Sequence, residues 1–299
     1  MRYTIAIPSY NNEGTIREAI NSCLNQIGTI DYELLISDDG STDSSIKIVE
    51  EFSEDYRVRI IKHSGDSSLY ENHNKCLREA KGDYVVFCHA DDTLFSDAIL
   101  KIDLALSCYN YPGKIVCFGR SFFRDFYNNF KQVGELNNIV SGISAQELFQ
   151  KGGITPAGTC YSRQSFLNNG GFLPMRNSIT PSDMTSMIKY SLDGAEFLML
   201  DRIIFKREFA STACNINKEA SFESKEHAIE ELSKVLSKNT METLFSNVIS
   251  FNSIDLQYML ILSRYSTDKK LKLKLKLKSI FKNPLILRHK FIRKLLLEK

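Results

Sequence analysis

The sequence predicts an α/β protein whose mostly parallel sheet is flanked by helices, and three observations support this prediction. Short runs rich in Ile, Val, Leu and Tyr, typical of strands buried on both faces, recur through the first hundred residues. Segments with apolar residues at helical spacing lie between these runs. Polar loops that carry carboxylates follow three of the runs. Strands and helices that alternate in this way predict βαβ units.

The first hundred residues contain four expected strands and three expected helices. The strands are expected at residues 3–8, 32–37, 58–62 and 83–88, and the helices at 15–26, 44–52 and 69–80. The last helix has the weakest apolar stripe. After residue 110 the pattern is less regular, with strands expected at 114–118 and 197–205 and helices at 144–151 and 182–192. From about residue 221 the sequence is typical of helices.

The length and composition allow one substantial core and a smaller appended region. The chain has 299 residues, of which 43% are hydrophobic and 25% are charged, as in ordinary globular proteins. We expect an α/β domain over residues 1–215 and a helical extension over 216–299, which ends in a basic amphipathic tail at 264–299. No apolar stretch approaches about 18 residues and no signal peptide is recognisable, so we expect a cytoplasmic protein.

The seven cysteines are scattered and form no Cys-x-x-Cys pair. None has a histidine at the spacing of a zinc site, which argues against a cysteine metal centre. Free thiols in apolar stretches behave as small hydrophobic groups. We therefore expect reduced core residues at Cys23, Cys76, Cys88, Cys108, Cys117, Cys160 and Cys214.

The candidate functional residues follow the expected strands. The first strand is followed by a loop from Ser9 to Glu13, the second by Asp38-Asp39-Gly40, and the fourth by Asp91-Asp92. Ligands of such sheets bind beyond the carboxyl ends of the strands. Each loop could also be only a turn or a helix start. Adjacent carboxylates, however, repel each other unless a cation neutralises them, and a divalent metal held with substrate phosphates is the usual solution.

These segments resemble a known family. Ile5-Ala-Ile-Pro-Ser-Tyr-Asn-Asn-Glu13, Leu35-Ile-Ser-Asp-Asp-Gly-Ser-Thr-Asp43 and Ala80-Lys-Gly-Asp-Tyr-Val-Val-Phe87, which leads to Asp91-Asp92, are similar in order and spacing to the family 2 glycosyltransferases with the GT-A fold. Asn74, the segment Gly158–Arg163, which looks like a later strand of the family, and the turn Gly170-Gly171-Phe172 extend the resemblance, which covers about residues 3–210. Many family members have Asp where this chain has His89, and an Asn is common at the position of His63.

The resemblance implies a nucleotide-sugar site. Pro8 and Tyr10 would line the nucleobase pocket with Glu13 nearby, and Asp39 would accept a hydrogen bond from the base, typically from uracil N3. Asp91 and Asp92 would bind the ribose and a Mn²⁺ or Mg²⁺ ion. The replacement at His89 leaves open which of these two aspartates is the main metal ligand.

The implied reaction is inverting transfer of a sugar from a nucleotide donor to a hydroxyl of a glycan or lipid-linked acceptor, as in bacterial surface polysaccharide synthesis. The expected donor is a UDP-sugar. It needs a base for the hydroxyl proton and a cation for the departing diphosphate. Family members carry an acidic base after the Gly-Gly-Phe turn, and Asp183 is the only carboxylate between Gly170 and Leu192. Pro181-Ser182-Asp183 is also a good helix start, where a carboxylate complements the helix dipole. Arg207 is a candidate contact to the diphosphate, although a solvated strand end is the favoured interpretation of this residue.

The tail needs a separate explanation. Residues 264–299 contain 13 Lys or Arg and two acidic residues, a net charge of +11, so the rest of the chain carries −9 of the overall +2. Basic residues interleaved with Leu, Ile and Phe favour an anionic membrane surface, which would place the protein peripherally on the inner face of the plasma membrane. Packing of the tail on its own domain is the second interpretation. Nucleic acid is not expected as a partner, because the tail has no aromatic stacking platform and the body is acidic.

Two other functions fit parts of the pattern. A sugar nucleotidyltransferase can use a similar sheet with paired carboxylates, but a glycine-rich basic loop would then follow the first strand. This chain has Ser9-Tyr-Asn-Asn-Glu13 at that place. The second alternative is a non-catalytic protein that binds a nucleotide-sugar, which applies if Asp183 is not a base.

Overall fold

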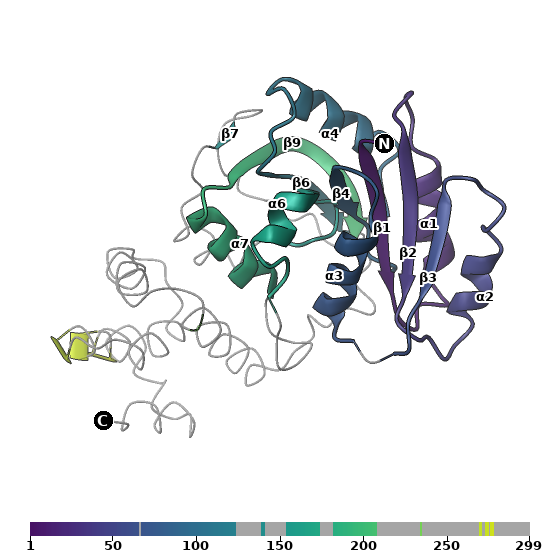
Figure 1. Ribbon diagram of the computed structural model, residues 1–299, viewed down its shortest axis with the longest axis horizontal. Helices are drawn as coiled ribbons and strands as arrows, with labels where there is room; N and C mark the ends of the chain where they lie inside the picture. Colours follow the sequence, from purple (N-terminus) through teal and green to yellow (C-terminus); the bar gives the residue numbers. More distant parts are fainter. Residues whose placement is uncertain are drawn as a thin grey trace. The chain divides into compact units, whose positions relative to one another are not determined.

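The computed structural model describes residues 1–65, 67–123, 139–140, 154–173 and 182–207, and residues 234, 269–270, 273–274 and 276–277, drawn in colour in Figure 1. For residues 120–123, 139–140, 201–203 and 207 it describes only the backbone. Contacts within the chain divide it into two units. The first comprises Met1–Ile143, Ile154–Pro174 and Tyr190–Cys214, and the second Ser144–Gly153, Met175–Lys189 and Asn215–Lys299. The domain boundary expected at residue 215 lies outside the described residues and stays a prediction.

Through residue 87 the described elements alternate between strands and helices, as the sequence predicts, and after it their order is less regular. In chain order they are β1 (Tyr3–Ser9), α1 (Ile16–Leu24), β2 (Tyr32–Asp38), α2 (Ser45–Glu50), β3 (Val58–Lys62), α3 (Leu69–Glu79), β4 (Tyr84–Phe87), β5 (Asp92–Leu94), α4 (Ala98–Ser107), β6 (Ile115–Phe123), β7 (Ile139–Val140), β8 (Cys160–Ser162), α6 (Arg163–Asn168), α7 (Ser182–Leu192) and β9 (Glu196–Arg207). The expected helix at 144–151 and those after residue 221 lie outside the described residues, apart from a few positions in the tail.

The strands of the first unit form one mixed sheet in the order β3-β2-β1-β4-β8-β6-β9-β5, and β7 pairs with β9. The four strands β3, β2, β1 and β4 run parallel. β8 is antiparallel to β4 and β6, and β9 runs parallel to β6. Every residue of β1, β2 and β4 is buried, because helices cover both faces of this part of the sheet. The carboxyl ends of β1, β2 and β4 therefore meet at one edge.

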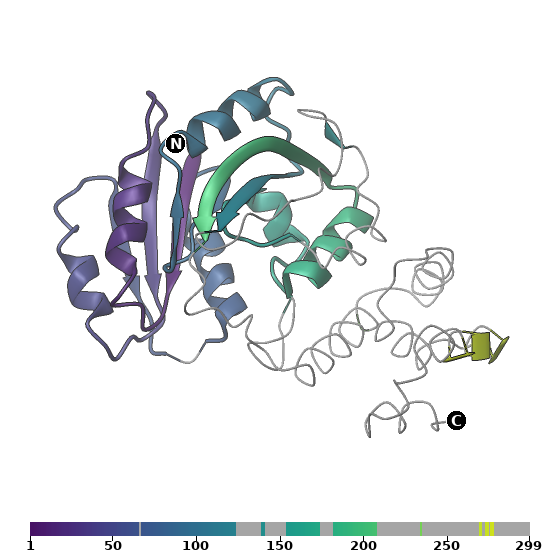
Figure 2. The ribbon, with the colours of Figure 1, turned by 180° about the vertical axis from the view of Figure 1, so that it is seen from behind.

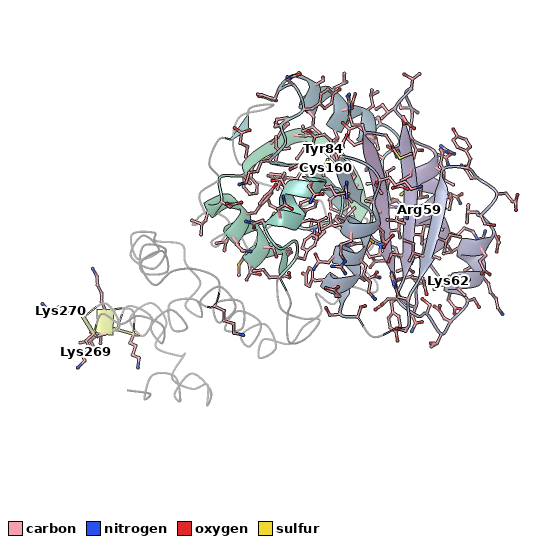
Figure 3. All side chains as sticks on the ribbon, in the orientation of Figure 1. Arg59, Lys62, Tyr84, Cys160, Lys269 and Lys270 are labelled. Carbon is pink, nitrogen blue, oxygen red and sulfur yellow. The ribbon has the colours of Figure 1, made fainter. Side chains whose placement is uncertain are left out.

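Helices pack on opposite faces of the sheet. α1 and α2 lie on the face turned toward the viewer in Figure 2, and α3 and α6 lie on the face turned toward the viewer in Figure 1. α1 buries one apolar stripe, formed by Ile16, Ala19, Ile20 and Cys23, as its sequence spacing predicts. Tyr84 of β4 and Cys160 of the neighbouring β8, both labelled in Figure 3, are buried, and Cys160 pairs with Val86, two residues after Tyr84.

The prediction of core cysteines is confirmed at five positions and wrong at one. Cys23, Cys76, Cys88, Cys117 and Cys160 are buried and free, whereas Cys108 is exposed. Cys108 caps the end of α4, beyond the buried stripe that ends at Leu106, and so lies outside the core. Cys214 lies outside the described residues.

The basic tail is described at a few positions only. Residues 269–270, 273–274 and 276–277 have helical backbone, so at these positions the strict Lys-Leu alternation does not form a strand. Leu273 and Leu277, one helical turn apart, are 58% and 45% exposed. Across the described residues, no helix is both long enough and apolar enough to span a lipid bilayer.

Candidate functional site

The loops after β1 and β2 are joined by reciprocal hydrogen bonds. The Asn11 amide donates to Ser41 Oγ (2.9 Å), and the Thr42 amide donates to Asn11 Oδ1 (2.8 Å). Asn11 adopts a left-handed backbone (φ 52°), which places its amide and side chain on the same neighbouring loop. Beside it, Tyr10 is 57% exposed, and its ring is open to a ligand that stacks there.

Glu13 braces the same two loops. Its Oε2 accepts from the Ser44 amide (2.9 Å), and its own amide donates to Asp43 Oδ2 (3.0 Å). Both carboxylates therefore satisfy backbone donors near the start of α2. The predicted place of Glu13 near a nucleobase stays a prediction, since the structure gives this side chain a loop contact.

Asp38 and Asp39, at the end of β2, have different roles in the structure. Asp38 forms the turn, since its carboxylate accepts from the amides of Gly40 (3.1 Å) and Ser41 (2.9 Å). Gly40 has φ +78°, and a Cβ there would lie 2.7 Å from the Gly65 Cα, so only glycine fits this turn. Asp39 is thereby left with its carboxylate outside the turn.

Asp39 is nearly buried and paired with a cation. Its side chain is 8% exposed, and its Oδ1 lies 3.2 Å from the Nζ of Lys75, itself 17% exposed, in α3. The Asp39 amide donates to the Ser9 carbonyl (2.9 Å), which fixes the residue against the end of β1. A buried carboxylate held in this way is a suitable acceptor for an N–H group of a ligand.

Asn72 of α3 ties the ends of β1 and β2 together. Its Nδ2 donates to the carbonyls of Ser9 (3.3 Å) and Ser37 (3.1 Å), and its Oδ1 accepts from Ser37 Oγ (2.7 Å). The Ser37 hydroxyl also accepts from His63 Nε2 at 3.0 Å. This network positions the loop that carries Asp39.

Asn74, two residues after Asn72 in α3, holds the Gly-Gly-Phe turn against this helix. Its Oδ1 accepts from the Phe172 amide (2.8 Å), and its Nδ2 donates to the Phe172 carbonyl (2.7 Å). Gly171 (φ +62°) has no room for a Cβ, which would lie 2.5 Å from Asn74 Oδ1. Asn74 and Gly171, both part of the family resemblance, therefore lie in direct contact in the structure.

The loop after β4 gathers three potential metal ligands. Ligand atoms of His89, Asp91 and Asp92 all lie within 4.8 Å of one another, and no other such group occurs in the described part of the chain. Asp92 is 2% exposed because it begins β5, whereas Asp91 and His89 are half-buried. Carboxylate oxygens with one imidazole nitrogen suit Mn²⁺, and the carboxylates alone suit Mg²⁺. The donor set therefore fits the expected divalent metal.

His73 lies behind this group, in α3. Burial among apolar groups, together with the neighbouring His89, lowers the pKa of His73 to about 3, so its ring is neutral at physiological pH. Its Nε2 lies 3.1 Å from His89 Nε2. Sequence reasoning missed His73, Asn72 and Lys75. The signal that could have found them was the weak apolar stripe of this helix, where Asn72-His73-Asn74-Lys75 interrupts the pattern.

The remaining predicted site residues are placed as follows. Arg207 pairs with Asp92 across the β5–β9 ladder, which puts its backbone beside the metal-ligand group. Lys206 extends toward Glu18 of α1 (4.0 Å). Pro8 lies in β1 between buried neighbours. Asp183 lies in the first turn of α7, where its Oδ1 accepts from the Met184 amide (2.9 Å). Asp183 belongs to the second unit, so its part in the site stays a prediction.

Comparisons with known proteins agree with this geometry. The model of a family described as glycosyl transferase family 2 matches residues 4–168. The poly(ribitol-phosphate) beta-glucosyltransferase of Bacillus spizizenii is 36% identical over 104 residues, which are 34% of this chain and 16% of the relative. The putative glycosyltransferase EpsE of Bacillus subtilis is 32% identical over 96 residues, 31% of this chain and 34% of the relative. The chain thus aligns with a minor part of these relatives' length.

Two solved structures have a similar fold. The structure of S. aureus TarS residues 1–349 with UDP-GlcNAc has a TM-score of 0.67 and 16% identity, over 99% of this chain and 88% of that chain. The mannosyltransferase PcManGT of Pyrobaculum calidifontis with GDP-Man and Mn²⁺ has a TM-score of 0.53 and 15% identity, over 98% and 82% of the two chains. At this identity the likeness concerns the fold.

Proposed function

The chain belongs to glycosyl transferase family 2 and has the GT-A fold, and on that premise we propose that it transfers a sugar, with inversion, from a UDP-sugar to a hydroxyl group. The acceptor that we propose is a glycan or lipid-linked precursor of a bacterial surface polysaccharide. The observation that carries the proposal is the group His89, Asp91 and Asp92, at the same sheet edge as Asp39.

The similar proteins support the donor and the acceptor class. The Bacillus spizizenii relative is a poly(ribitol-phosphate) beta-glucosyltransferase, and the TarS structure contains UDP-GlcNAc. The PcManGT structure contains GDP-Man and Mn²⁺, which supports a metal-dependent nucleotide site in this fold. The identity of the sugar is a separate question, because these proteins bind different donors.

We assign the donor side of the reaction to residues at the strand ends. Asp39 would accept a hydrogen bond from the nucleobase, and Tyr10 and Pro8 would line the same pocket. Asp91 and Asp92 would hold a Mn²⁺ or Mg²⁺ ion, which when bound neutralises the charge of the departing diphosphate. Arg207 would add a second positive charge for the diphosphate.

The acceptor side depends on one carboxylate. An inverting transfer needs a base that removes the proton of the acceptor hydroxyl as its oxygen attacks the anomeric carbon. We assign this role to Asp183, at the start of α7. Its side chain is half-buried, and it is the only carboxylate between Gly170 and Leu192.

We further propose that the basic tail binds an anionic membrane surface, where a lipid-linked acceptor would lie. The net charge of +11 over residues 264–299 supports this, as do the exposed Leu273 and Leu277 beside exposed Lys269, Lys270 and Lys274, two of which Figure 3 labels. A Lys or Arg near an anionic surface contributes about 1 kcal/mol.

A donor assay separates the proposal from its alternatives. The full chain is incubated with individual UDP-sugars and Mn²⁺ or Mg²⁺, with and without a lipid-linked acceptor, and released UDP is measured. We expect UDP release that requires the metal and increases with acceptor. Binding without release would indicate a non-catalytic binding protein, and pyrophosphate formation from a nucleoside triphosphate and a sugar phosphate would indicate a nucleotidyltransferase.

A further inference from the structure

Two histidines from distant parts of the sequence share a hydrogen bond at the candidate metal group. His73 lies in α3 and His89 follows β4, and their Nε2 atoms are 3.1 Å apart. The rings are perpendicular, with centroids 5.2 Å apart, so the contact is edge-on. One hydrogen lies between the two nitrogens, and it must belong to one ring or the other.

The surroundings of His73 decide which ring carries that hydrogen. His73 Nδ1 lies 2.8 Å from the Leu69 carbonyl oxygen, which can only accept, so Nδ1 is the protonated nitrogen. The ring is fully buried and packs on Phe87 and Phe172, with centroid distances of 4.9 and 5.4 Å. A neutral ring with its hydrogen on Nδ1 has a lone pair on Nε2.

His89 is therefore held in one tautomer. Its Nε2 donates to His73 Nε2, so in the form that carries a single hydrogen the lone pair is on Nδ1. That Nδ1 lies 3.5 Å from Asp92 Oδ2, within the group that includes Asp91. Two ligand atoms about 2.1 Å from a shared divalent cation lie about 3 Å or slightly more apart, so this spacing fits joint coordination.

We propose that His89 Nδ1 is a ligand of the divalent metal beside Asp91 and Asp92, and that His73 is a positioning residue that holds His89 in the required tautomer. The inference rests on the metal-dependent donor site proposed above. A second ring nitrogen fixed by a hydrogen bond is the usual arrangement of a metal-binding histidine. Because Mg²⁺ prefers oxygen ligands, a site with one imidazole favours Mn²⁺, Co²⁺ or Zn²⁺ over Mg²⁺.

The tautomer can be measured directly on the full chain. Long-range ¹H–¹⁵N spectra of protein labelled in histidine report which ring nitrogens carry hydrogen, and the His89→Asn variant assigns the His89 signals. We expect a hydrogen on His89 Nε2 alone, and a shift of Nδ1 on addition of diamagnetic Zn²⁺ while Nε2 stays protonated. A hydrogen on Nδ1 at neutral pH, or an Nδ1 signal that Zn²⁺ leaves unchanged, would overturn the proposal.

Metal affinities of matched variants give a second test. His89→Asp replaces nitrogen by oxygen, and we expect the ratio of Mn²⁺ to Mg²⁺ affinity to fall about tenfold. His73→Phe fills the ring space but cannot accept from His89, and we expect an affinity for Zn²⁺ that is 10- to 100-fold weaker. His73→Gln can accept at the same position, so it should recover much of that loss. Thermal unfolding of each variant shows whether it folds.

The control is Glu54→Gln, because Glu54 is exposed and is not part of the metal-ligand group. Its affinity for Zn²⁺ should equal that of the wild type. Equal affinities of His73→Phe and wild type, or an unchanged metal preference in His89→Asp, would refute the assignment. If the chain binds metal through His89 but releases no UDP from any donor, the proposed function fails and this inference stands. If the chain releases UDP from a donor but His89 does not bind the metal, the proposed function stands and the assignment of His89 as a ligand fails.

Discussion

Lys75 Nζ lies 3.2 Å from Asp39 Oδ1, so a lysine of α3 fixes the carboxylate at the end of β2. Both side chains are largely buried, unlike the exposed pair of Arg17 and Glu51 on α1 and the segment after α2. An exposed ion pair contributes little to stability, whereas a buried pair depends on both partners. We infer that Lys75 orients Asp39 for the nucleobase.

Asp39→Asn and Lys75→Met should both weaken UDP binding. The first removes the charge of the acceptor, and the second removes the cation that orients it. Hydrogen bonds to charged groups contribute about 1.5–3 kcal/mol, so we expect a loss of 10- to 100-fold in affinity by calorimetry. Arg17→Met is the control. If it weakened UDP binding as much as Lys75→Met, the effect would not come from the site.

Asp183→Asn should abolish transfer and leave donor binding nearly unchanged. Loss of a general base typically lowers kcat by 10²- to 10⁴-fold, whereas the carboxamide keeps the size and the helix-start hydrogen bond. The measurements are turnover with the best UDP-sugar and calorimetric affinity for the same donor. Near-normal turnover would make Asp183 a structural residue at the start of α7.

Glu33 gives the fold a defined pH dependence. Burial opposes its ionisation, but hydrogen bonds from Arg59, the Lys81 amide and Thr4 outweigh this, so its pKa is lowered. A carboxyl whose pKa is lower in the folded state stabilises the fold above its unfolded pKa of about 4.3. That contribution disappears as the pH falls through the folded pKa.

Glu33→Gln should therefore lower the free energy of unfolding by about 2 kcal/mol at pH 7. The difference from wild type should shrink below about pH 4.3, because Glu33 of the unfolded chain then takes up a proton, and Glu33 of the folded chain does so at lower pH. Urea unfolding between pH 3 and 7 measures both effects. The exposed Glu54→Gln should match wild type throughout, and a difference for Glu33→Gln that persists unchanged at pH 3 would contradict the assignment.

The basic tail should direct the chain to anionic liposomes. In flotation experiments we expect association with vesicles that contain anionic lipid, weakened by salt and absent with neutral vesicles. Truncation after residue 263 should remove the association, and Lys269→Glu with Lys270→Glu should reduce it. Equal flotation with both vesicle types, or no effect of truncation, would favour packing of the tail on the protein.

The strands of the parallel half could be predicted closely. The expected runs 3–8, 32–37 and 58–62 differ from β1, β2 and β3 by at most one residue. β1 and β2 are buried at every residue and have the continuous apolar sequences of strands covered on both faces, whereas β3 is half-buried at the edge of the sheet. The three-residue strand β5 could not be predicted, and β8 was expected only through the family resemblance of the segment Gly158–Arg163. They are too short for a periodic pattern, and they form by pairing with β9 and β4, which are distant in the sequence.

The candidate site was predictable where residues follow strands and not where they lie on a helix. Asp39, Asp91 and Asp92 follow apolar runs that were expected as strands. Their position after a strand predicts that their side chains lie at the carboxyl edge of the sheet. His73 and Lys75 carry no such signal, since their neighbours in space come from β2 and from the loop after β4. A polar helix face is in most proteins a solvated one, and only the packing shows that this face is turned inward.

The binding of UDP with and without a divalent metal tests the central claim most directly. Calorimetric titration of the wild type and of Asp92→Ala, with Mn²⁺ and with a chelator, separates the metal contribution from the rest of the site. We expect tight binding by the wild type in Mn²⁺, and weaker binding of equal strength in the other three conditions. Equal affinity of the mutant and the wild type in Mn²⁺ would remove Asp92 from the metal site, and a wild-type affinity for UDP that does not depend on Mn²⁺ would contradict a metal-bound nucleotide-sugar at this sheet edge.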